Sequence, residues 1–168
     1  MKDKTVVITG ATSGLGRATA LQLAQNGAFV IIIARNNAKA TEIMNEIEKE
    51  GGKGLFVISD LLSMKDTKEA AGSITYAVKR LDVLINNAGA HFPKYIETSE
   101  GFESTLALNY LSPFLLTHHL IEQMEQTASG YGEARIINVS SVMHKGPINW
   151  DDLNYKDTTY SSTSAYYQ

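Results

Sequence analysis

The chain has 168 residues, of which 43% are hydrophobic and 20% are charged, a composition typical of one folded domain. Its net charge is -3 and its lysines and arginines are scattered, so we predict neither a nucleic-acid partner nor a membrane partner. Cysteine is absent, which excludes disulfides and thiolate catalysis and favours a cytoplasmic location. The longest strongly apolar run, residues 28–34, is far shorter than the roughly 20 residues that span a bilayer.

Apolar, β-branched runs alternate with longer amphipathic stretches along the chain. The predicted strands are residues 5–9, 28–34, 54–59, 82–85 and 135–139. The predicted helices are residues 14–26, 37–50, 63–80 and 100–127. The strands are hydrophobic at successive positions, as expected of a parallel sheet that helices cover on both faces. The pattern therefore predicts a single α/β domain over residues 1–168 with a doubly wound parallel sheet, the Rossmann fold.

A glycine-rich turn, Thr9-Gly10-Ala11-Thr12-Ser13-Gly14-Leu15-Gly16, joins the first strand to the first helix. Glycines permit close approach of the backbone to a pyrophosphate, and a helix N-terminus offers free N–H groups. The alternative is a tight turn without a ligand, which the flanking strand and helix make the weaker interpretation. A triphosphate-binding loop is excluded because no lysine follows Gly10 at the required offset. We predict a dinucleotide site formed by Gly10, Thr12, Ser13, Gly14, Leu15 and Gly16.

The second strand ends in Ile33-Ala34-Arg35-Asn36, where a dinucleotide fold meets the adenosine ribose. No carboxylate is present to bind a 2′-hydroxyl, whereas arginine offers a planar fork to a 2′-phosphate. We therefore predict that Arg35 binds this phosphate and that NADP(H) is preferred, with NAD(H) possible. The alternative is that Arg35 is a solvated loop charge. Arg17, on the first helical turn, is either an assisting cation or an exposed residue.

These motifs resemble those of the short-chain dehydrogenase/reductase family. Residues 9–16 are similar to its Thr-Gly-x-x-x-Gly-x-Gly cofactor motif, and residues 86–89 are similar to its Asn-Asn-Ala-Gly signature. The resemblance implies that Asn87, Ala88 and Gly89 lie along the cofactor. It also implies that Asp60 and Leu61, after the third strand, contact the adenine. The alternative role for Asp60 is a helix N-cap, which Ser63 could fill equally well.

Reduction of a carbonyl by hydride needs a proton donor at the oxygen and polar groups that hold the developing alkoxide. The segment after the fifth strand resembles the family segment whose second serine orients the substrate oxygen, which implies Ser141. In isolation, two serines after a strand are usually turn formers. Residues 164–168 resemble the family's Tyr-x-x-x-Lys motif cut short, which implies Tyr166 as the acid/base, or Tyr167 if the register slips by one. The lysine would fall two positions after Gln168.

The segment Leu108-Asn109-Tyr110-Leu111-Ser112-Pro113-Phe114 resembles the family helix whose asparagine completes a proton relay, which implies Asn109. Pro113 has no N–H to donate to the carbonyl of Asn109, so we expect the helix to kink and leave this C=O free. The alternative is a core helix with an incidental proline.

Residues 143–154 resemble retinol-dehydrogenase-like members, which share a Ser-Ser-x-x-His start and a Phe-Asp-Asp-Leu-Asn end. Trp150 stands in place of the phenylalanine, and we expect this segment near the substrate mouth. His144, His118 and His119 are expected to be surface or packing residues, and no metal site is predicted.

The doubly wound pattern uses roughly six strands and five are predicted, so at least one strand–helix unit of about 30 residues is expected to be missing on the C-terminal side. The fifth strand is then expected to be an exposed apolar edge. The leading hypothesis is an NADP(H)-dependent oxidoreductase that interconverts an alcohol and a carbonyl, with an apolar small-molecule substrate. We expect a homo-oligomer at full length and no activity of the 168-residue chain alone. The alternative, which the absent lysine favours, is a non-catalytic NADP(H)-binding sensor or scaffold.

Overall fold

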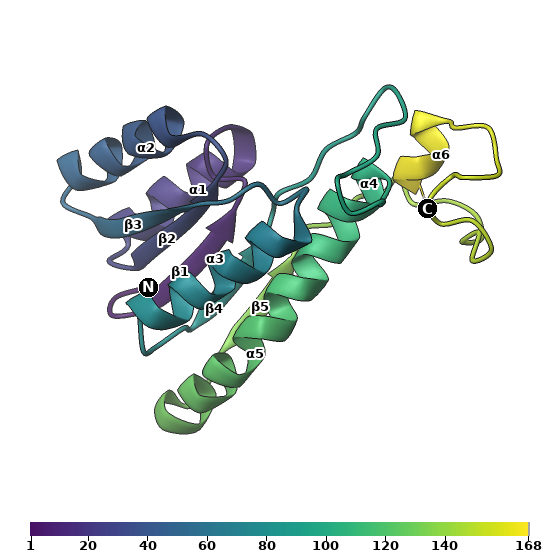
Figure 1. The fold of residues 1–168 in the computed structure, drawn as a ribbon. Coiled ribbons are helices and arrows are strands. Elements are labelled where there is room, and N and C mark those ends of the chain that lie inside the picture. The colour runs from purple at the N-terminus through teal and green to yellow at the C-terminus, as the bar shows by residue number, and fades with distance from the viewer. Residues whose placement is uncertain (168) are drawn as a thin grey trace.

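The computed structural model describes residues 1–167 as one parallel sheet with helices on both faces (Figure 1). The elements are β1 (Thr5–Thr9), α1 (Gly14–Gln25), β2 (Phe29–Ala34), α2 (Asn37–Lys49), β3 (Lys53–Ile58), α3 (Met64–Ala77), β4 (Val83–Asn86), α4 (Ser104–Leu106), the π-helical turn η1 (Ala107–Leu111), α5 (Ser112–Tyr131), β5 (Arg135–Asn138) and α6 (Ser162–Tyr167). The strand order is β3-β2-β1-β4-β5, and every pairing is parallel. The predicted doubly wound sheet is confirmed.

Successive residues of β1 pack into different cores because side chains alternate across a strand. Val6 and Ile8 join the core under α1 and α2, whereas Val7 joins the core under α3 and α5. In β2 the same alternation sends Ile32 to the first core and Ile31 to the second. Both faces of the central strands therefore need apolar side chains, which explains their unbroken hydrophobic runs.

The edge strand β5 is the least buried part of the sheet. All four of its residues are exposed, and Ile137 keeps 44% of its surface. Among residues 1–167, β5 pairs with β4 alone. The exposed apolar edge expected from the sequence is therefore present.

Helix ends follow local chemistry. Asn36 and Ser63 cap α2 and α3, because each side-chain oxygen accepts from a backbone N–H in the first turn, at 3.0 and 3.1 Å. Gly27 and Gly51, with φ of +84° and +79°, follow α1 and α2 in the left-handed conformation that glycine adopts readily at helix ends. Most predicted bounds differ from the observed ones by at most three residues.

The helix predicted at residues 100–127 is the exception. It begins at Ser104, because the buried Glu103 carboxylate accepts from two backbone N–H groups of the next turn, at 2.8 and 2.9 Å. It continues to Tyr131, and the π-helical turn η1, which contains Asn109, lies near its start. A π-turn inserts an extra residue into the helix just before Pro113, whose missing N–H removes one hydrogen bond of a regular helix at this point.

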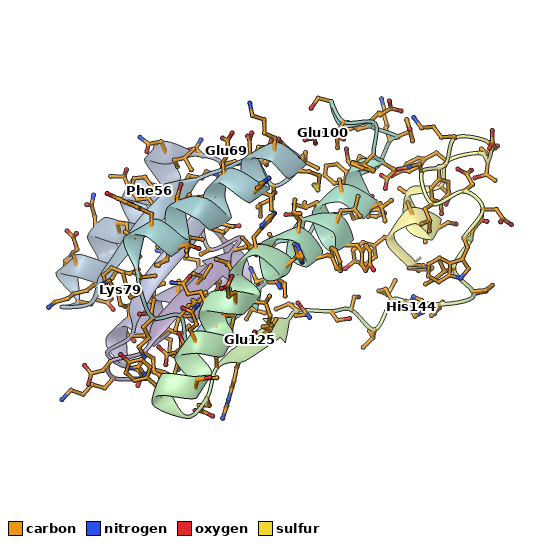
Figure 2. All side chains as sticks on the ribbon, turned by 60° about the horizontal axis from the view of Figure 1, so that its bottom comes forward. Phe56, Glu69, Lys79, Glu100, Glu125 and His144 are labelled. Atoms are coloured by element: carbon orange, nitrogen blue, oxygen red, sulfur yellow. The ribbon has the colours of Figure 1, made fainter. Side chains whose placement is uncertain are left out.

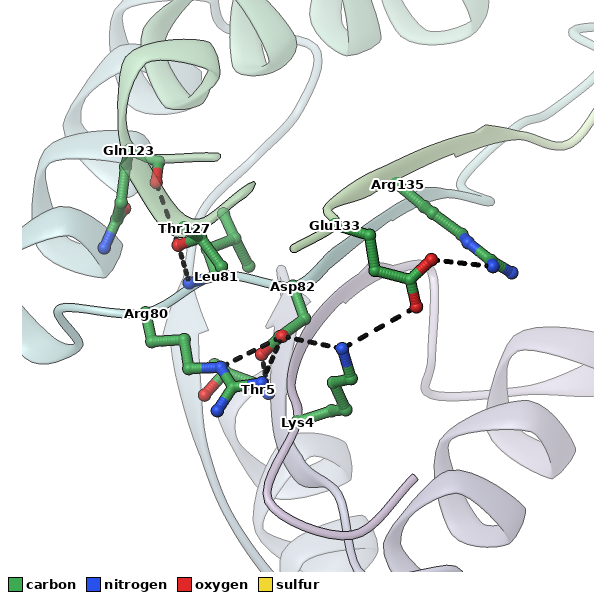
Figure 3. Close-up of polar contacts among 9 residues, drawn as sticks. All are labelled: Lys4, Thr5, Arg80, Leu81, Asp82, Gln123, Thr127, Glu133 and Arg135. Carbon is green, nitrogen blue, oxygen red and sulfur yellow. Dashed lines mark hydrogen bonds and ion pairs between the residues drawn. The ribbon is translucent and has the colours of Figure 1, made fainter. Parts of the chain in front are cut away.

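A buried carboxylate ties the amino ends of β1 and β4 together (Figure 3). Asp82, which is 1% exposed, accepts from Thr5 N at 2.8 Å and from Arg80 Nη2 at 2.7 Å, and Lys4 Nζ lies 3.2 Å away. Burial alone would raise the pKa of Asp82, but the hydrogen bonds from Arg80, Thr5 and Lys4 outweigh it and hold this pKa below its usual range. The network fixes the sheet at the end opposite the glycine-rich turn.

None of the helices within residues 1–167 combines the length and the apolar character needed to cross a membrane.

Candidate functional site

A cavity of about 430 Å³ lies at the carboxyl ends of the central strands. Its lining includes all twelve residues that the sequence places on a cofactor: Gly10, Thr12, Ser13, Gly14, Leu15, Gly16, Arg35, Asp60, Leu61, Asn87, Ala88 and Gly89. The sequence reasoning did not identify seven other lining residues: Ile33, Ala34, Ser59, Leu62, Ala90, Phe92 and Leu108. The first four border the ends of β2 and β3, so the rule that ligands meet parallel strands at their carboxyl ends could have found them.

The glycine-rich turn passes very close to the end of β4. A Cβ on Gly10, whose φ is +67°, would lie 2.9 Å from the Cα of Ala88. A Cβ on Gly16 would overlap the side-chain amide of Asn87 and the backbone oxygen of Gly10. Glycine is therefore required at both positions by the packing of the turn itself.

Hydrogen bonds hold the turn on β4. Asn87 Nδ2 donates to the backbone oxygens of Thr9, at 2.9 Å, and Gly10, at 3.3 Å. Thr9 Oγ1 in turn accepts from the backbone N–H groups of Asn87, at 3.0 Å, and Ala88, at 2.8 Å. The Asn-Asn-Ala-Gly segment thus fixes the wall of the cavity.

The N-terminus of α1 has no side-chain cap. Ser13 occupies the N-cap position without a side-chain hydrogen bond, and the first turn contains no acidic residue. This contrasts with α2 and α3, whose caps come from Asn36 and Ser63. The free N–H groups at the start of α1 belong to residues that line the cavity, so this end of the cavity suits a phosphate group.

Arg35 lies in the part of the lining where β2 ends. It is exposed and forms no ion pair with any carboxylate among residues 1–167. Arg17, by contrast, is ion-paired with Glu46 of α2, so its guanidinium is already occupied. Arg35 is the cation that remains available to an anionic ligand in the cavity.

Asp60 is a lining carboxylate whose Oδ1 accepts from Leu62 N at 3.0 Å. The alternative role as the cap of α3 is wrong for Asp60, because Ser63 fills it. The Asp60 side chain is therefore free of helix capping where it lines the cavity.

Asn109, in η1, holds the chain that follows the Asn-Asn-Ala-Gly segment. Its Oδ1 accepts from Ala90 N and its Nδ2 donates to Ala90 O, both at 2.9 Å. A Cβ on Gly89 would lie 3.4 Å from Asn109 Oδ1. The π-turn thus aims the asparagine side chain at the backbone beside the cavity.

The three residues predicted for catalysis lie on separate segments. Ser141 follows β5 and its Oγ accepts from Met143 N at 3.1 Å, while Tyr166 lies in α6 next to α4 (Figure 1). Within residues 1–167, no hydrogen bond joins Ser141, Tyr166 and Asn109 to one another, and none of the three lines the 430 Å³ cavity. The structure therefore assembles the predicted cofactor residues in one cavity and places the predicted catalytic residues outside its lining.

The segment between β5 and α6 is fixed by its own polar contacts. Asp152 accepts from three backbone N–H groups at 2.7 to 3.1 Å, and Asn154 Oδ1 accepts from Glu103 N at 2.9 Å. Tyr160 donates its hydroxyl to Phe92 O at 2.9 Å. Burial and the nearby negative charge of Glu103 raise the pKa of Tyr160, which keeps this hydroxyl a donor.

The histidines named from the sequence are exposed or engaged in packing. His144 lies on the segment between β5 and α6 (Figure 2), and its Nδ1 is 2.6 Å from Tyr167 O. His118 packs against the ring of Phe114, with centroids 6.5 Å apart, and against His119, at 5.3 Å.

Known proteins resemble the chain throughout. A profile of the short chain dehydrogenase family matches residues 4–152. Retinol dehydrogenase 13 of Homo sapiens is 37% identical over 172 residues, covering 98% of this chain and 50% of that protein. Polyprenol dehydrogenase of Homo sapiens is 37% identical over 169 residues, covering 99% of this chain and 51% of that protein. The chain thus spans about half the length of these curated relatives.

Two solved structures share the fold. A metagenomic short-chain oxidoreductase in complex with NADP has a TM-score of 0.78 at 27% identity, covering 99% of this chain and 72% of its own. An NADH-dependent reductase complexed with NAD has a TM-score of 0.76 at 26% identity, covering 88% of this chain and 64% of its own. The fold, the glycine-rich turn and the matched profile lead to one conclusion: the chain belongs to the short-chain dehydrogenase/reductase family, in its retinol-dehydrogenase-like subgroup.

Proposed function

We propose that this chain is the cofactor-binding part of an NADP(H)-dependent oxidoreductase that interconverts an alcohol and a carbonyl by hydride transfer. The observation that carries the proposal is the cavity of about 430 Å³, which combines the uncapped N-terminus of α1 with the guanidinium of Arg35, unpaired within residues 1–167. The first suits the linked phosphates of a dinucleotide, and the second suits a further phosphate on the ribose.

The preference for NADP(H) rests on charge at the end of β2. Arg35 and Asn36 follow this strand, and the Asn36 side chain is occupied as the cap of α2. No carboxylate stands there to hold a 2′-hydroxyl or to repel a 2′-phosphate. NAD(H) is the second candidate, because one solved relative binds NADP and another binds NAD.

The bound nicotinamide supplies or accepts the hydride. In the direction of reduction, the Tyr166 hydroxyl gives its proton to the substrate oxygen as the carbonyl becomes an alcohol, and the Ser141 hydroxyl holds that oxygen. Asn109 acts through the backbone, because its side chain fixes Ala90 at the edge of the cavity. In the direction of oxidation, the same tyrosine takes the proton back.

The substrate that we propose is an apolar alcohol or its carbonyl form. Two relatives are named for retinol and polyprenol, both of which are apolar alcohols. Exposed apolar side chains also follow β5 around Ser141: Val142 keeps 94% of its surface and Met143 keeps 40%. An apolar substrate would cover such side chains on binding.

Titration with NADPH and with NADH, each followed by nicotinamide fluorescence, tests the cofactor site. The full-length protein is then mixed with NADPH and apolar aldehydes or ketones, or with NADP⁺ and the matching alcohols, and nicotinamide absorbance is followed. We expect tighter binding of NADPH than of NADH and turnover of at least one apolar pair. Binding without turnover would favour a non-catalytic sensor or scaffold, and failure to bind either dinucleotide would overturn both functions.

A further inference from the structure

Residues 90–92 are here called the β4 loop. Hydrogen bonds hold the backbone of Ala90 and of Phe92, the two neighbours of His91. Asn109 fixes Ala90 through its N–H and its carbonyl, each at 2.9 Å. Tyr160 fixes Phe92 through a hydrogen bond to its carbonyl at 2.9 Å. Ala90 and Phe92 line the cavity, whereas the side chain of His91 is exposed between them. The backbone on either side of His91 is therefore tied down beside the candidate cofactor site.

The segment that carries the proposed acid/base contacts this β4 loop twice. Tyr160 binds Phe92 as described, and the ring of Tyr166 packs on the ring of His91. The two ring centroids are 5.7 Å apart and the ring planes meet at 84°, an edge-to-face arrangement. The edge of one ring thus points at the face of the other, which restricts where the phenol can lie.

Few other contacts position Tyr166. No residue of α6 is buried, and the helix packs beside α4 rather than on the sheet (Figure 1). Within residues 1–167 the phenolic hydroxyl of Tyr166 forms no hydrogen bond, and its ring is held by the contact with His91. Removing the His91 ring would leave the phenol free to move.

We propose that His91 is a positioning residue, whose ring contact holds the Tyr166 phenol beside the β4 loop. The inference rests on the proposed function, because it takes Tyr166 to be the acid/base. Proton transfer requires the donor oxygen within hydrogen-bond reach of the substrate oxygen, and small displacements of a reacting group lower the rate steeply. His91 itself exchanges no proton with the substrate in this scheme.

The test compares His91→Ala and His91→Phe in the full-length protein with NADPH and a turned-over carbonyl. Phenylalanine keeps an aromatic ring for the edge-to-face contact, and alanine removes it. We expect His91→Ala to lower kcat about tenfold with an unchanged Kd for NADPH, and His91→Phe to restore most of the loss. The matched control is His118→Ala, which removes an exposed histidine ring from α5 and is expected to keep the wild-type kcat.

Wild-type kcat in His91→Ala would overturn the inference, and so would an equal loss in both His91 variants, because the ring contact would then not explain the effect. Tyr166→Phe separates this failure from failure of the proposed function. If Tyr166→Phe loses turnover while His91→Ala keeps it, only the positioning role of His91 is rejected, and the acid/base role of Tyr166 stands. Normal turnover in Tyr166→Phe removes the acid/base assignment itself.

Discussion

The side-chain amide of Asn87 donates to the backbone oxygen of Thr9 at 2.9 Å, and the two residues are 78 positions apart in the sequence. The shape of the glycine-rich turn therefore depends on the end of β4 as well as on its own glycines. The same amide occupies the space that a side chain on Gly16 would need. Two motifs that look independent in the sequence form one packed unit in the fold.

Replacement of Gly16 by alanine should disrupt this unit. The added methyl group would overlap the Asn87 amide and the Gly10 carbonyl, so the turn has to move away from β4. We expect the Kd for NADPH to rise at least tenfold, and we expect overpacking to lower the free energy of unfolding by about 1–3 kcal/mol. Titration with NADPH and denaturant unfolding measure the two effects.

Gly72→Ala is the matched control. Gly72 lies inside α3, and a Cβ there would meet nothing within 4 Å. Alanine is favoured over glycine in a helix by about 1 kcal/mol, so we expect a slight gain in stability and an unchanged Kd for NADPH. Wild-type affinity in Gly16→Ala would contradict the close packing described for the turn.

Much of the cofactor site was predictable because it follows strand ends. Gly10, Arg35, Asp60 and Asn87 each come shortly after an apolar run, and the carboxyl ends of parallel strands meet along one edge of a sheet. Strand order then brings them together, although they are far apart in the sequence. Local signals of this kind are strongest where the strand is buried on both faces, as β1, β2 and β4 are.

The contacts around the β4 loop were not predictable. Ala90 and Phe92 line the cavity because Asn109 and Tyr160 bind their backbone, and backbone partners leave no pattern in the sequence. The start of the α4 helix was also missed. Its cap is a buried glutamate, Glu103, and glutamate is not among the residues preferred at an N-cap.

Arg35 should determine the preference of the site for NADPH over NADH. In Arg35→Ala the guanidinium that faces the proposed 2′-phosphate is lost, while the groups at the start of α1 are untouched. We expect the Kd for NADPH to rise by roughly tenfold to a hundredfold and the Kd for NADH to stay within about twofold. Separate fluorescence titrations with the two cofactors measure the change in preference.

Arg17→Ala is the control for a general loss of positive charge. Arg17 is ion-paired with Glu46, so its removal should change the two Kd values by similar small factors. A selective loss of NADPH affinity in Arg17→Ala, with none in Arg35→Ala, would contradict our proposal. It would show that Arg17, and not Arg35, binds the 2′-phosphate.

Asp82 should make the free energy of unfolding depend on pH in the acidic range. Its pKa is lowered in the folded chain, so its contribution to stability is present above the ordinary aspartate pKa and is lost as the pH falls through the folded value. We therefore expect stability to drop below about pH 4 in the wild type and to drop less over that range in Asp82→Asn. At neutral pH the variant should be less stable by about 3 kcal/mol, because Arg80 and Lys4 lose their partner.

Urea unfolding between acid and neutral pH measures this prediction, with Glu133→Gln as the control. Glu133 also pairs with Lys4, at 3.8 Å, but its side chain is 54% exposed, so we expect a loss of less than about 1 kcal/mol. Equal pH profiles for wild type and Asp82→Asn would show that the network in Figure 3 does not control acid stability.

Tyr166→Phe removes the hydroxyl that we propose as the proton donor and keeps the ring that contacts His91. We expect kcat in the full-length protein to fall by about 10²-fold or more, because general acid–base groups contribute effects of this size. The Kd for NADPH should not change, since Tyr166 does not line the cavity. Tyr167→Phe is the matched control, because it removes the neighbouring hydroxyl from the same helix. If Tyr167→Phe loses turnover while Tyr166→Phe keeps it, the motif is shifted by one residue and the acid/base is Tyr167, so that the His91 contact would position the wrong ring.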